Sequence, residues 1–485
     1  MASIDNTKTN KALFKNTGII AIGQISTRVI SFLLLPLYTA LLSQEDYGIV
    51  DLLTTYSGLI MVIVGLQINQ AVFRFLVTCR DDDEKKTGVI STVLTSTVVI
   101  CVVYAILFAI VSPFIRISYI WYLLIHVIVS IFLQTASGIA RGLGRNGDFS
   151  VGNFISASVI IVLNVLFIAV LRLGVESMLW AYIIGPVIGG IYIMMRCRVL
   201  RWFSVKATTK QELKTILNYS LPLVPNELSW SVIHASDRMV VSWFLNVAVN
   251  GLIAVAAKFS TIYTAFFSVF NTSWTEQVVL HYKDSGGTEY INEMFSKVIT
   301  FFASLAIGII ACMPFVFPVF VNAEFAESYG AIPFYMIAVF FNAVVGLLSP
   351  IYLINNETKQ VAISTAVAAA VNLGTDIALI GFIGMYAAPV SSILAYLTIS
   401  IWRVIDINRR HCRISMPLKR IVGILIMLAI ALTGYFSEIL WVRIVTLAVV
   451  VLITFAVNLP FLKSLKSMLK KEKPQTDTPP REPGL

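Results

Sequence analysis

Residues 38–60 read YTALLSQEDYGIVDLLTTYSGLI, and residues 241–263 read VSWFLNVAVNGLIAVAAKFSTIY. Setting Gly48 on Gly251 aligns the two stretches at an offset of 203 residues. Each stretch consists of an apolar helix, a short turn, a glycine and a second helix with a stripe of polar or small residues. The match predicts an internal repeat, and chance resemblance between two apolar helices remains the alternative.

The chain around these stretches is too apolar for a soluble protein of this size. Hydrophobic residues make up 58% of its 485 residues and charged residues 13%, and the mean hydropathy is +0.84. A helix needs about 20 mostly apolar residues to cross a bilayer. We therefore predict an all-α polytopic membrane protein with about 14 transmembrane helices, at residues 17–42, 49–77, 88–112, 118–140, 151–171, 175–195, 216–245, 249–275, 296–321, 331–354, 361–381, 384–404, 419–437 and 440–461.

An offset that spans six helices preserves their orientation in the membrane. The repeat therefore predicts two six-helix bundles related by a pseudo-two-fold axis along the membrane normal, plus two C-terminal helices. The predicted segments are an N-terminal tail (1–16), an N-terminal bundle (17–195), a basic linker (196–215), a C-terminal bundle (216–404), a basic loop (405–418), two extra helices (419–461) and a basic, Pro-rich tail (462–485).

Lysine and arginine collect on alternate loops of this predicted topology. The basic loops are 78–87, 141–150, 196–215, 276–295, 355–360 and 405–418, together with both tails. The opposite loops are short and mainly acidic. Basic loops face the cytoplasm, so both termini are predicted to be cytoplasmic. This asymmetry accounts for the net charge of +10, and no nucleic-acid partner is expected because the cations lie at the ends of spans.

A few positive charges lie inside predicted spans, where a charge costs roughly 2.5–3.5 kcal/mol on insertion scales. Arg28 belongs to the first span, Arg238 to the seventh and Lys258 to the eighth. Because lipid does not tolerate them, they are predicted to line a cationic cavity that binds an anion. Arg74 lies near the cytoplasmic end of the second span. It either lines this cavity or extends its side chain to the membrane interface.

Three carboxylates accompany these cations. Glu227 and Asp237 lie in the seventh span and Asp376 lies in the eleventh. They are predicted to bind a coupling ion or to balance the positive charges. In the alternative interpretation, Asp237 and Arg238 neutralise one another locally without any role in transport.

Two local motifs have structural interpretations. Pro222 and Pro225 are predicted to break or bend the seventh span near its cytoplasmic end. Residues 142–147, GLGRNG, match a dinucleotide-binding pattern, but such a site needs a preceding strand and a soluble helix. The glycines are therefore predicted to form a tight cytoplasmic turn. No metal-ligand cluster is recognisable, and no cofactor is expected.

With these residues placed, the chain resembles bacterial polysaccharide exporters of the Wzx type. They belong to the superfamily of multidrug and toxin extruders and lipid II flippases. The resemblance is clearest in GQISTRVISFLLLPLYTALLSQEDYGIVDL (23–52), ARGLGRNGDFSVGN (140–153), FNTSWTEQ (270–277) and residues 220–260. It implies a V-shaped pair of bundles around a central cavity with Arg28, Arg238 and Lys258 as its cations.

The resemblance also implies a function and a location. The function is transfer of an undecaprenyl-pyrophosphate-linked oligosaccharide from the inner to the outer leaflet of the bacterial inner membrane, without enzymatic chemistry. The products would be O-antigen (lipopolysaccharide), capsule or exopolysaccharide. A polysaccharide polymerase and a chain-length regulator are candidate partners beside the bilayer itself.

Other functions on the same scaffold remain open. A lipid II flippase differs only in the head group of its substrate. A multidrug or toxin cation antiporter favours an anionic or aromatic cavity, whereas this sequence predicts a cationic one. A polymerase or membrane glycosyltransferase usually needs a sizeable outer loop or a soluble catalytic face, which the short outer loops do not supply.

Overall fold

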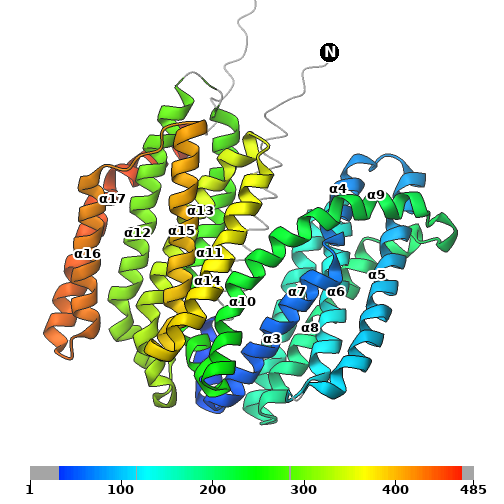
Figure 1. The fold of residues 1–485 in the computed structure, drawn as a ribbon, viewed down its shortest axis with the longest axis horizontal. Coiled ribbons are helices and arrows are strands. Elements are labelled where there is room, and N and C mark those ends of the chain that lie inside the picture. Colours follow the sequence, from blue (N-terminus) through cyan, green and yellow to red (C-terminus); the bar gives the residue numbers. More distant parts are fainter. Residues whose placement is uncertain (1–31, 116, 283, 285, 472–485) are drawn as a thin grey trace, which may run out of the picture. The chain divides into compact units, whose positions relative to one another are not determined.

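The computed structural model describes residues 32–471 except 116, 283 and 285, and for residues 460–471 it describes the backbone alone. In this part of the chain the regular structure is helical throughout (Figure 1). The predicted all-α class is therefore confirmed. Most of the first predicted span, 17–42, lies outside the described residues.

The described helices of the first half coincide with the predicted spans, apart from a break within the span 49–77. They are α2 (Leu35–Leu41), α3 (Gln44–Gly65), α4 (Ile68–Thr78), α5 (Asp83–Val111), α6 (Trp121–Gly142), α7 (Asn146–Asn164), the π-helical η2 (Val165–Val170) and α8 (Val175–Arg196). Two short 3-10 turns, η3 (Val199–Trp202) and η4 (Val205–Ala207), then lead out of the bundle.

The second half repeats this order. It consists of α9 (Lys210–Ser220), α10 (Val224–Phe244), α11 (Val247–His281), α12 (Gly287–Phe320), α13 (Ile332–Ile354), α14 (Thr358–Ile383) and α15 (Ala387–Arg410), followed by α16 (Leu418–Phe436) and α17 (Leu440–Lys471). The 3-10 turn η5 (Leu221–Leu223) separates α9 from α10, which confirms the predicted break at Pro222.

By length and composition, eleven helical segments of the described chain are apolar enough to cross a membrane. The difference from fourteen has three sources. The first predicted span is largely undescribed, α10 carries too many charged residues, and α14 and α15 count as one segment from Thr358 to Arg410. The chain is therefore a multi-pass membrane protein.

Two predicted boundaries were wrong. The span 49–77 is not continuous, because Leu66 and Gln67 adopt left-handed φ angles of 47° and 54° and divide it into α3 and α4. No proline or glycine pair marks this break. The predicted loop 276–295 is much shorter, because α11 continues to His281 and α12 already begins at Gly287. Polar residues extend both helices beyond the apolar stretch that the prediction followed.

The internal repeat is confirmed by matching backbone features. Ser43 accepts a hydrogen bond from the backbone N–H of Asp46 at 3.1 Å, and Asn246 accepts one from Val249 at 2.8 Å. These N-caps of α3 and α11 satisfy otherwise unpaired helix N–H groups. Ser43 and Asn246 are 203 positions apart, and so are Asp46 and Val249. Chance resemblance between apolar sequences does not place equivalent caps at equivalent positions.

The turns between later helices also match. The predicted tight turn at residues 142–147 exists, with Gly144 at φ +77°, and its counterpart is Asn356 at φ +57° between α13 and α14. In each turn a backbone N–H reaches back five residues, from Arg145 to Ala140 at 2.8 Å and from Glu357 to Tyr352 at 3.0 Å. This is the hydrogen-bonding pattern of a Schellman helix end.

The aligned glycines meet in space. A Cβ atom built on Gly48 would lie 2.0 Å from the carbonyl oxygen of Val247, and one built on Gly251 would lie 2.1 Å from that of Gln44. Asn250 adds a hydrogen bond from its Nδ2 to the Gly48 carbonyl at 3.0 Å. The contact is reciprocal, as expected where a pseudo-two-fold axis passes between α3 and α11.

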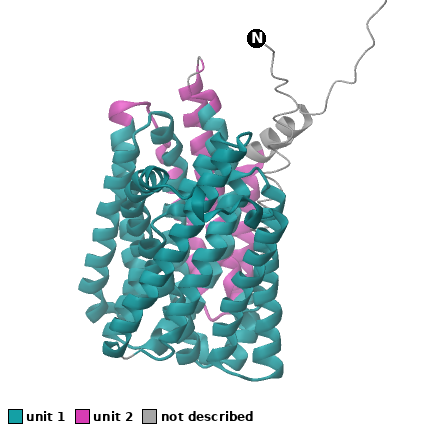
Figure 2. Cartoon of the chain, turned by 90° about the vertical axis from the view of Figure 1, so that its right-hand side faces the viewer, with its two compact units in different colours: residues 1–279, 315–407 teal, residues 280–314, 408–485 magenta. Residues whose placement is uncertain are grey.

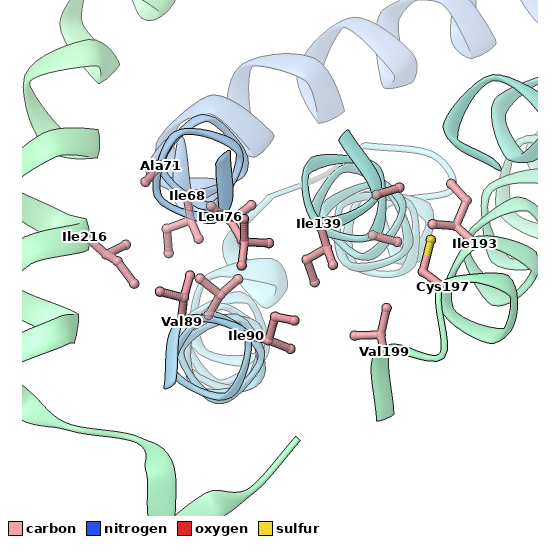
Figure 3. Packing of buried hydrophobic residues seen from close by; sticks show 14 of the residues in the cluster. Ile68, Ala71, Leu76, Val89, Ile90, Ile139, Ile193, Cys197, Val199 and Ile216 are labelled. Atoms are coloured by element: carbon pink, nitrogen blue, oxygen red, sulfur yellow. The ribbon is translucent and has the colours of Figure 1, made fainter. Parts of the chain in front are cut away.

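The first half has its own apolar core around α4. Ile68 and Leu76 of α4 pack with Ile90 of α5, Ile139 of α6 and Ile216 of α9 (Figure 3). All five side chains are almost completely buried. This core fixes the ends of helices whose connecting loops were predicted to be cytoplasmic.

Packing divides the chain into two compact units, coloured in Figure 2: residues 1–279 with 315–407, and residues 280–314 with 408–485. The first unit contains α3–α8 together with α10 and α13–α15. In the second unit, Gly434 of α16 packs against Thr446 of α17, and Asn458 donates to Ser304 Oγ at 3.1 Å. This division follows the packing of helices, whereas the predicted domain boundaries follow the internal repeat and the loops. Those boundaries stay a prediction.

Candidate functional site

Helix α10 connects the two halves through two adjacent charged residues. Consecutive side chains on a helix point in different directions, because a turn takes 3.6 residues. Asp237 is directed to α14 and α15, where its partners are Asn372, Ser391 and Ser392. Arg238 is directed to α3 of the first half.

Asp237 lies in a buried network of neutral donors. Its carboxylate accepts hydrogen bonds from Ser392 Oγ at 2.9 Å, Asn372 Nδ2 at 3.4 Å and Ser391 Oγ at 3.5 Å. Ser236 donates to the other side of the same amide, at Asn372 Oδ1. The network ties three helices together around a carboxylate that is only 2% exposed.

Asp376 lies one turn after Asn372 on α14 and has a different environment. It is completely buried, and neither carboxylate oxygen has a hydrogen-bond partner among the described residues. It interacts electrostatically with Asp237. Two carboxylates in one apolar interior repel each other, and an ionised carboxylate without a donor is costly to bury. This pair therefore has the chemistry to hold a proton or another cation.

Arg238 forms an ion pair across the two halves. Its Nε lies 3.3 Å from Asp51 Oδ2 of α3, and its Nη1 lies 4.0 Å from Asp237 Oδ2. The Arg238 and Asp51 side chains are 16% and 22% exposed. Lys258 of α11 interacts electrostatically with both Asp51 and Arg238. One carboxylate of the first half thus pairs with Arg238 and attracts Lys258, both of the second half.

The structure does not bring all predicted site residues together. Arg28 lies outside the described residues. Arg74 is exposed on α4, and its guanidinium stacks 4.3 Å above the ring of Tyr219 on α9, near the end of the bundle. Glu227 is exposed in the first turn of α10, ten residues before Asp237, which corresponds to about 15 Å along a helix.

Sequence reasoning missed several polar residues of this region. Asp51 was passed over because it stands near the start of a predicted span, although it is a charge within one. Ser391 and Ser392 carry no distinguishing signal. Arg403 of α15 is completely buried and donates to Ser349 Oγ at 2.7 Å, Ser364 Oγ at 3.3 Å and Thr365 Oγ1 at 3.4 Å.

Comparison with known proteins places this arrangement in a family. The model of the family described as "Polysaccharide biosynthesis protein" matches residues 13–275, more than half of the chain. The chain belongs to the polysaccharide biosynthesis protein family. The matched region includes Asp51, Arg238 and Lys258. The comparison with curated protein sequences finds no match.

Several solved structures of membrane proteins resemble the fold of this chain. The lipid II flippase MurJ in an inward closed conformation has a TM-score of 0.71 at 16% identity, over 92% of this chain and 99% of MurJ. An inward-facing multidrug resistance MATE transporter of the MOP superfamily has a TM-score of 0.59 at 18% identity, over 80% of this chain and 98% of its own. The outward-facing form of a MATE transporter gives 0.57 at 17%, over 81% and 96%.

At these identities the likeness establishes the fold alone, which this chain shares with the solved MurJ and MATE structures. The solved structures carry the names of transporters and a flippase rather than of enzymes. The chain is thus a multi-pass membrane protein of the polysaccharide biosynthesis protein family, and its fold is similar to that of these transporters and this flippase.

Proposed function

We propose that the chain is a flippase for undecaprenyl-pyrophosphate-linked oligosaccharide repeat units of an O-antigen, capsule or exopolysaccharide. It would move them from the cytoplasmic to the outer leaflet of the bacterial inner membrane by alternating access, with both of its own termini cytoplasmic. Family membership and the two-lobed fold support the proposal. The observation that carries it is the cluster of Arg238, Lys258 and Asp51 between the two halves.

The cluster suits a pyrophosphate head group. A phosphate anion that crosses hydrocarbon loses its hydration, and guanidinium and ammonium groups replace that hydration with charge-assisted hydrogen bonds. In this structure Asp51 forms an ion pair with Arg238. A pyrophosphate would compete with Asp51 for the same guanidinium. Substrate binding would then weaken an ion pair that joins α3 to α10, and this links binding to movement of one half against the other.

Helix α11 provides a surface for the sugar. Thr261, Ser268, Thr272 and Thr275 follow Lys258 at helical spacing, and each hydroxyl donates to a carbonyl of its own helix. All four residues are partly or fully exposed. Their donors are thus satisfied while their oxygen atoms keep acceptor capacity for sugar hydroxyls. The polyprenyl tail would remain in lipid.

Asp237 and Asp376 are proposed as the site that couples transport to a cation. A proton or metal cation would relieve the repulsion between the two buried carboxylates. Its release would restore a negative charge beside Arg238, whose Nη1 is 4.0 Å from Asp237. Glu227 would balance charge at the exposed first turn of α10 rather than at this pair. No bond is made or broken, and no cofactor is required.

Transport of a lipid-linked oligosaccharide into sealed proteoliposomes tests the proposal. Lys258→Ala and Arg28→Ala are expected to lower the transport rate at least about tenfold, because each removes a charge-assisted contact with the pyrophosphate. The matched control is Lys214→Ala, which removes an exposed lysine on α9. Both site variants should insert into the membrane normally. Wild-type rates in both would refute the cationic site.

The same vesicles separate the alternative functions. A lipid II flippase would transport lipid II faster than the oligosaccharide lipid. A multidrug antiporter would move a cationic dye and ignore both lipids. Coexpression and pull-down with a polysaccharide polymerase and a chain-length regulator would test the proposed partners.

A further inference from the structure

A second cationic site lies apart from the transport cluster, at the loops of the first half. The connections α4–α5, α6–α7 and α8–η3 converge on a cavity of about 290 Å³. We propose that this cavity, here called the basic pocket, binds the phosphate head group of an anionic phospholipid of the surrounding membrane. Its lining consists of five cations and three other side chains: Arg80, Lys86, Arg145, Arg198, Arg201, Leu143, Cys197 and Trp202.

Contacts with the backbone and with an aromatic ring hold part of the lining in place. Arg80 donates from Nε to the Gly142 carbonyl at 2.7 Å and from Nη2 to the Arg141 carbonyl at 3.3 Å. A Cβ atom on Gly144 would come within 3.2 Å of the same guanidinium. Lys86 lies 4.6 Å above the ring of Trp202. The tight turn at residues 142–147 thus shapes one wall of the basic pocket.

The lining has an excess of positive charge. Lys86 pairs with Asp83 at 2.5 Å and Arg145 with Asp148 at 3.3 Å. For Arg80, Arg198 and Arg201, no acidic side chain of the described residues lies within ion-pair distance. No acidic residue lines the pocket. The three arginines without an acidic partner repel each other, so an anion bound among them lowers the electrostatic energy. Arginine in particular offers paired N–H donors that match phosphate oxygens.

Apolar side chains beside the pocket identify the phosphate as that of a lipid. Leu200 stands between Arg198 and Arg201 and is 73% exposed, and Met195 before them is 72% exposed. Beyond them, Val205 of η4 is 68% exposed. Exposed apolar residues interleaved with cations are typical of a surface at the level of lipid head groups. A free phosphate in bulk water would leave these side chains without an apolar partner.

The inference does not depend on the transported substrate. The basic pocket belongs to the first half alone, and its ligand would be a permanent neighbour in the bilayer. A protein that transports its substrate but does not bind phospholipid would contradict the basic pocket alone. A protein that binds phospholipid but does not transport the substrate would contradict the proposed function alone.

Native mass spectrometry of the delipidated, full-length protein in detergent tests the site. The probes are phosphatidylglycerol, phosphatidylcholine and inorganic phosphate, each added alone. Phosphatidylglycerol is expected to remain bound to the wild-type protein. The variant Arg198→Gln/Arg201→Gln is expected to bind it at least about tenfold more weakly, because each cation contributes binding free energy near an anionic lipid surface. Both arginines are exposed, so the thermal unfolding midpoint should not move.

The matched control is Lys206→Gln/Lys210→Gln, which removes two exposed cations of the same connection outside the pocket. This variant should bind phosphatidylglycerol within about twofold of the wild type, because its charges do not line the cavity. An equal loss in the control would show general surface attraction and overturn the site. If phosphatidylcholine is retained as well as phosphatidylglycerol, the pocket does not select for an anion. If inorganic phosphate alone binds as well as phosphatidylglycerol, the assignment to a lipid is overturned.

Discussion

The two halves of this protein share a backbone and differ in charge. Equivalent caps, turns and the Gly48–Gly251 contact repeat at matching positions. At the offset of Gly48 and Gly251, Arg238 corresponds to Leu35 and Lys258 to Thr55. At the offset of the later turn pair, Gly144 and Asn356, Asp376 corresponds to Asn164. The first half thus carries neutral residues where the second half carries charges.

The comparison teaches that the scaffold and the site obey different constraints. Two helices that cross closely need small residues and satisfied backbone groups on both sides, so symmetry is preserved there. The proposed transport site needs a few charges, and most of those among the described residues lie in the second half: Arg238, Lys258, Asp237 and Asp376. Asp51 is where the first half contributes, through its ion pair with Arg238.

The largest effect is expected where the halves are most alike. Gly48→Ala and Gly251→Ala each place a Cβ about 2 Å from a backbone carbonyl, so the two helices must separate at a cost of about 3 kcal/mol. Thermal unfolding of the purified protein measures this. Gly58→Ala on α3 is the control, because nothing lies within 4 Å of its Cβ position. If only one of the two variants lost stability, the contact between Gly48 and Gly251 would not be reciprocal.

The next effect concerns a charge that exists in one half only. Arg403 is completely buried among hydroxyls of α13 and α14, whereas the corresponding residues 191–193 of α8 carry no charge. Each hydroxyl also donates to a carbonyl of its own helix. Arg403→Ala therefore removes the donor to the three hydroxyl oxygens and leaves a buried void, which should cost about 2 kcal/mol. Arg409→Ala, an exposed arginine of the same helix, should leave the unfolding midpoint unchanged. Equal midpoints for both variants would show that Arg403 is not a structural anchor.

Exchange of a single polar group between the halves gives a third test. Asp376→Asn makes the second half resemble the first, where Asn164 donates to the Tyr38 hydroxyl at 2.9 Å. The variant should fold with a change of less than about 1 kcal/mol, since it removes an unpartnered carboxylate. Its transport rate should no longer depend on the concentrations of H⁺ or Na⁺. Wild-type cation dependence in Asp376→Asn would exclude Asp376 from coupling.

The smallest effect is expected for Arg74. Its cation–π contact with Tyr219 is exposed and contributes less than about 1 kcal/mol. Arg74→Gln should therefore keep transport within about twofold of the wild type. A loss as large as that of Lys258→Ala would return Arg74 to the transport site.

Much of the fold was predictable because membrane insertion depends on local sequence. Apolar stretches of sufficient length mark spans, prolines mark the break before α10, and glycine marks the turn at 144. The α3–α4 break was not predictable, because left-handed backbone at Leu66 and Gln67 depends on the packing around them. Of the site, Arg238, Lys258, Asp237 and Asp376 were predicted from the cost of charge in lipid, whereas their pairing was not.

By itself, the sequence determined that this chain is a multi-pass helical membrane protein, because hydrophobic length is a local property. It indicated the internal repeat, which the matching caps and the Gly48–Gly251 contact then confirmed. Only the tertiary structure decided that Arg238 pairs with Asp51, that Asp376 has no hydrogen-bond donor among the described residues and that five cations line one cavity. These relations join residues from different helices. Electrostatic energy depends on distances in space, and those distances exist only once the helices have packed.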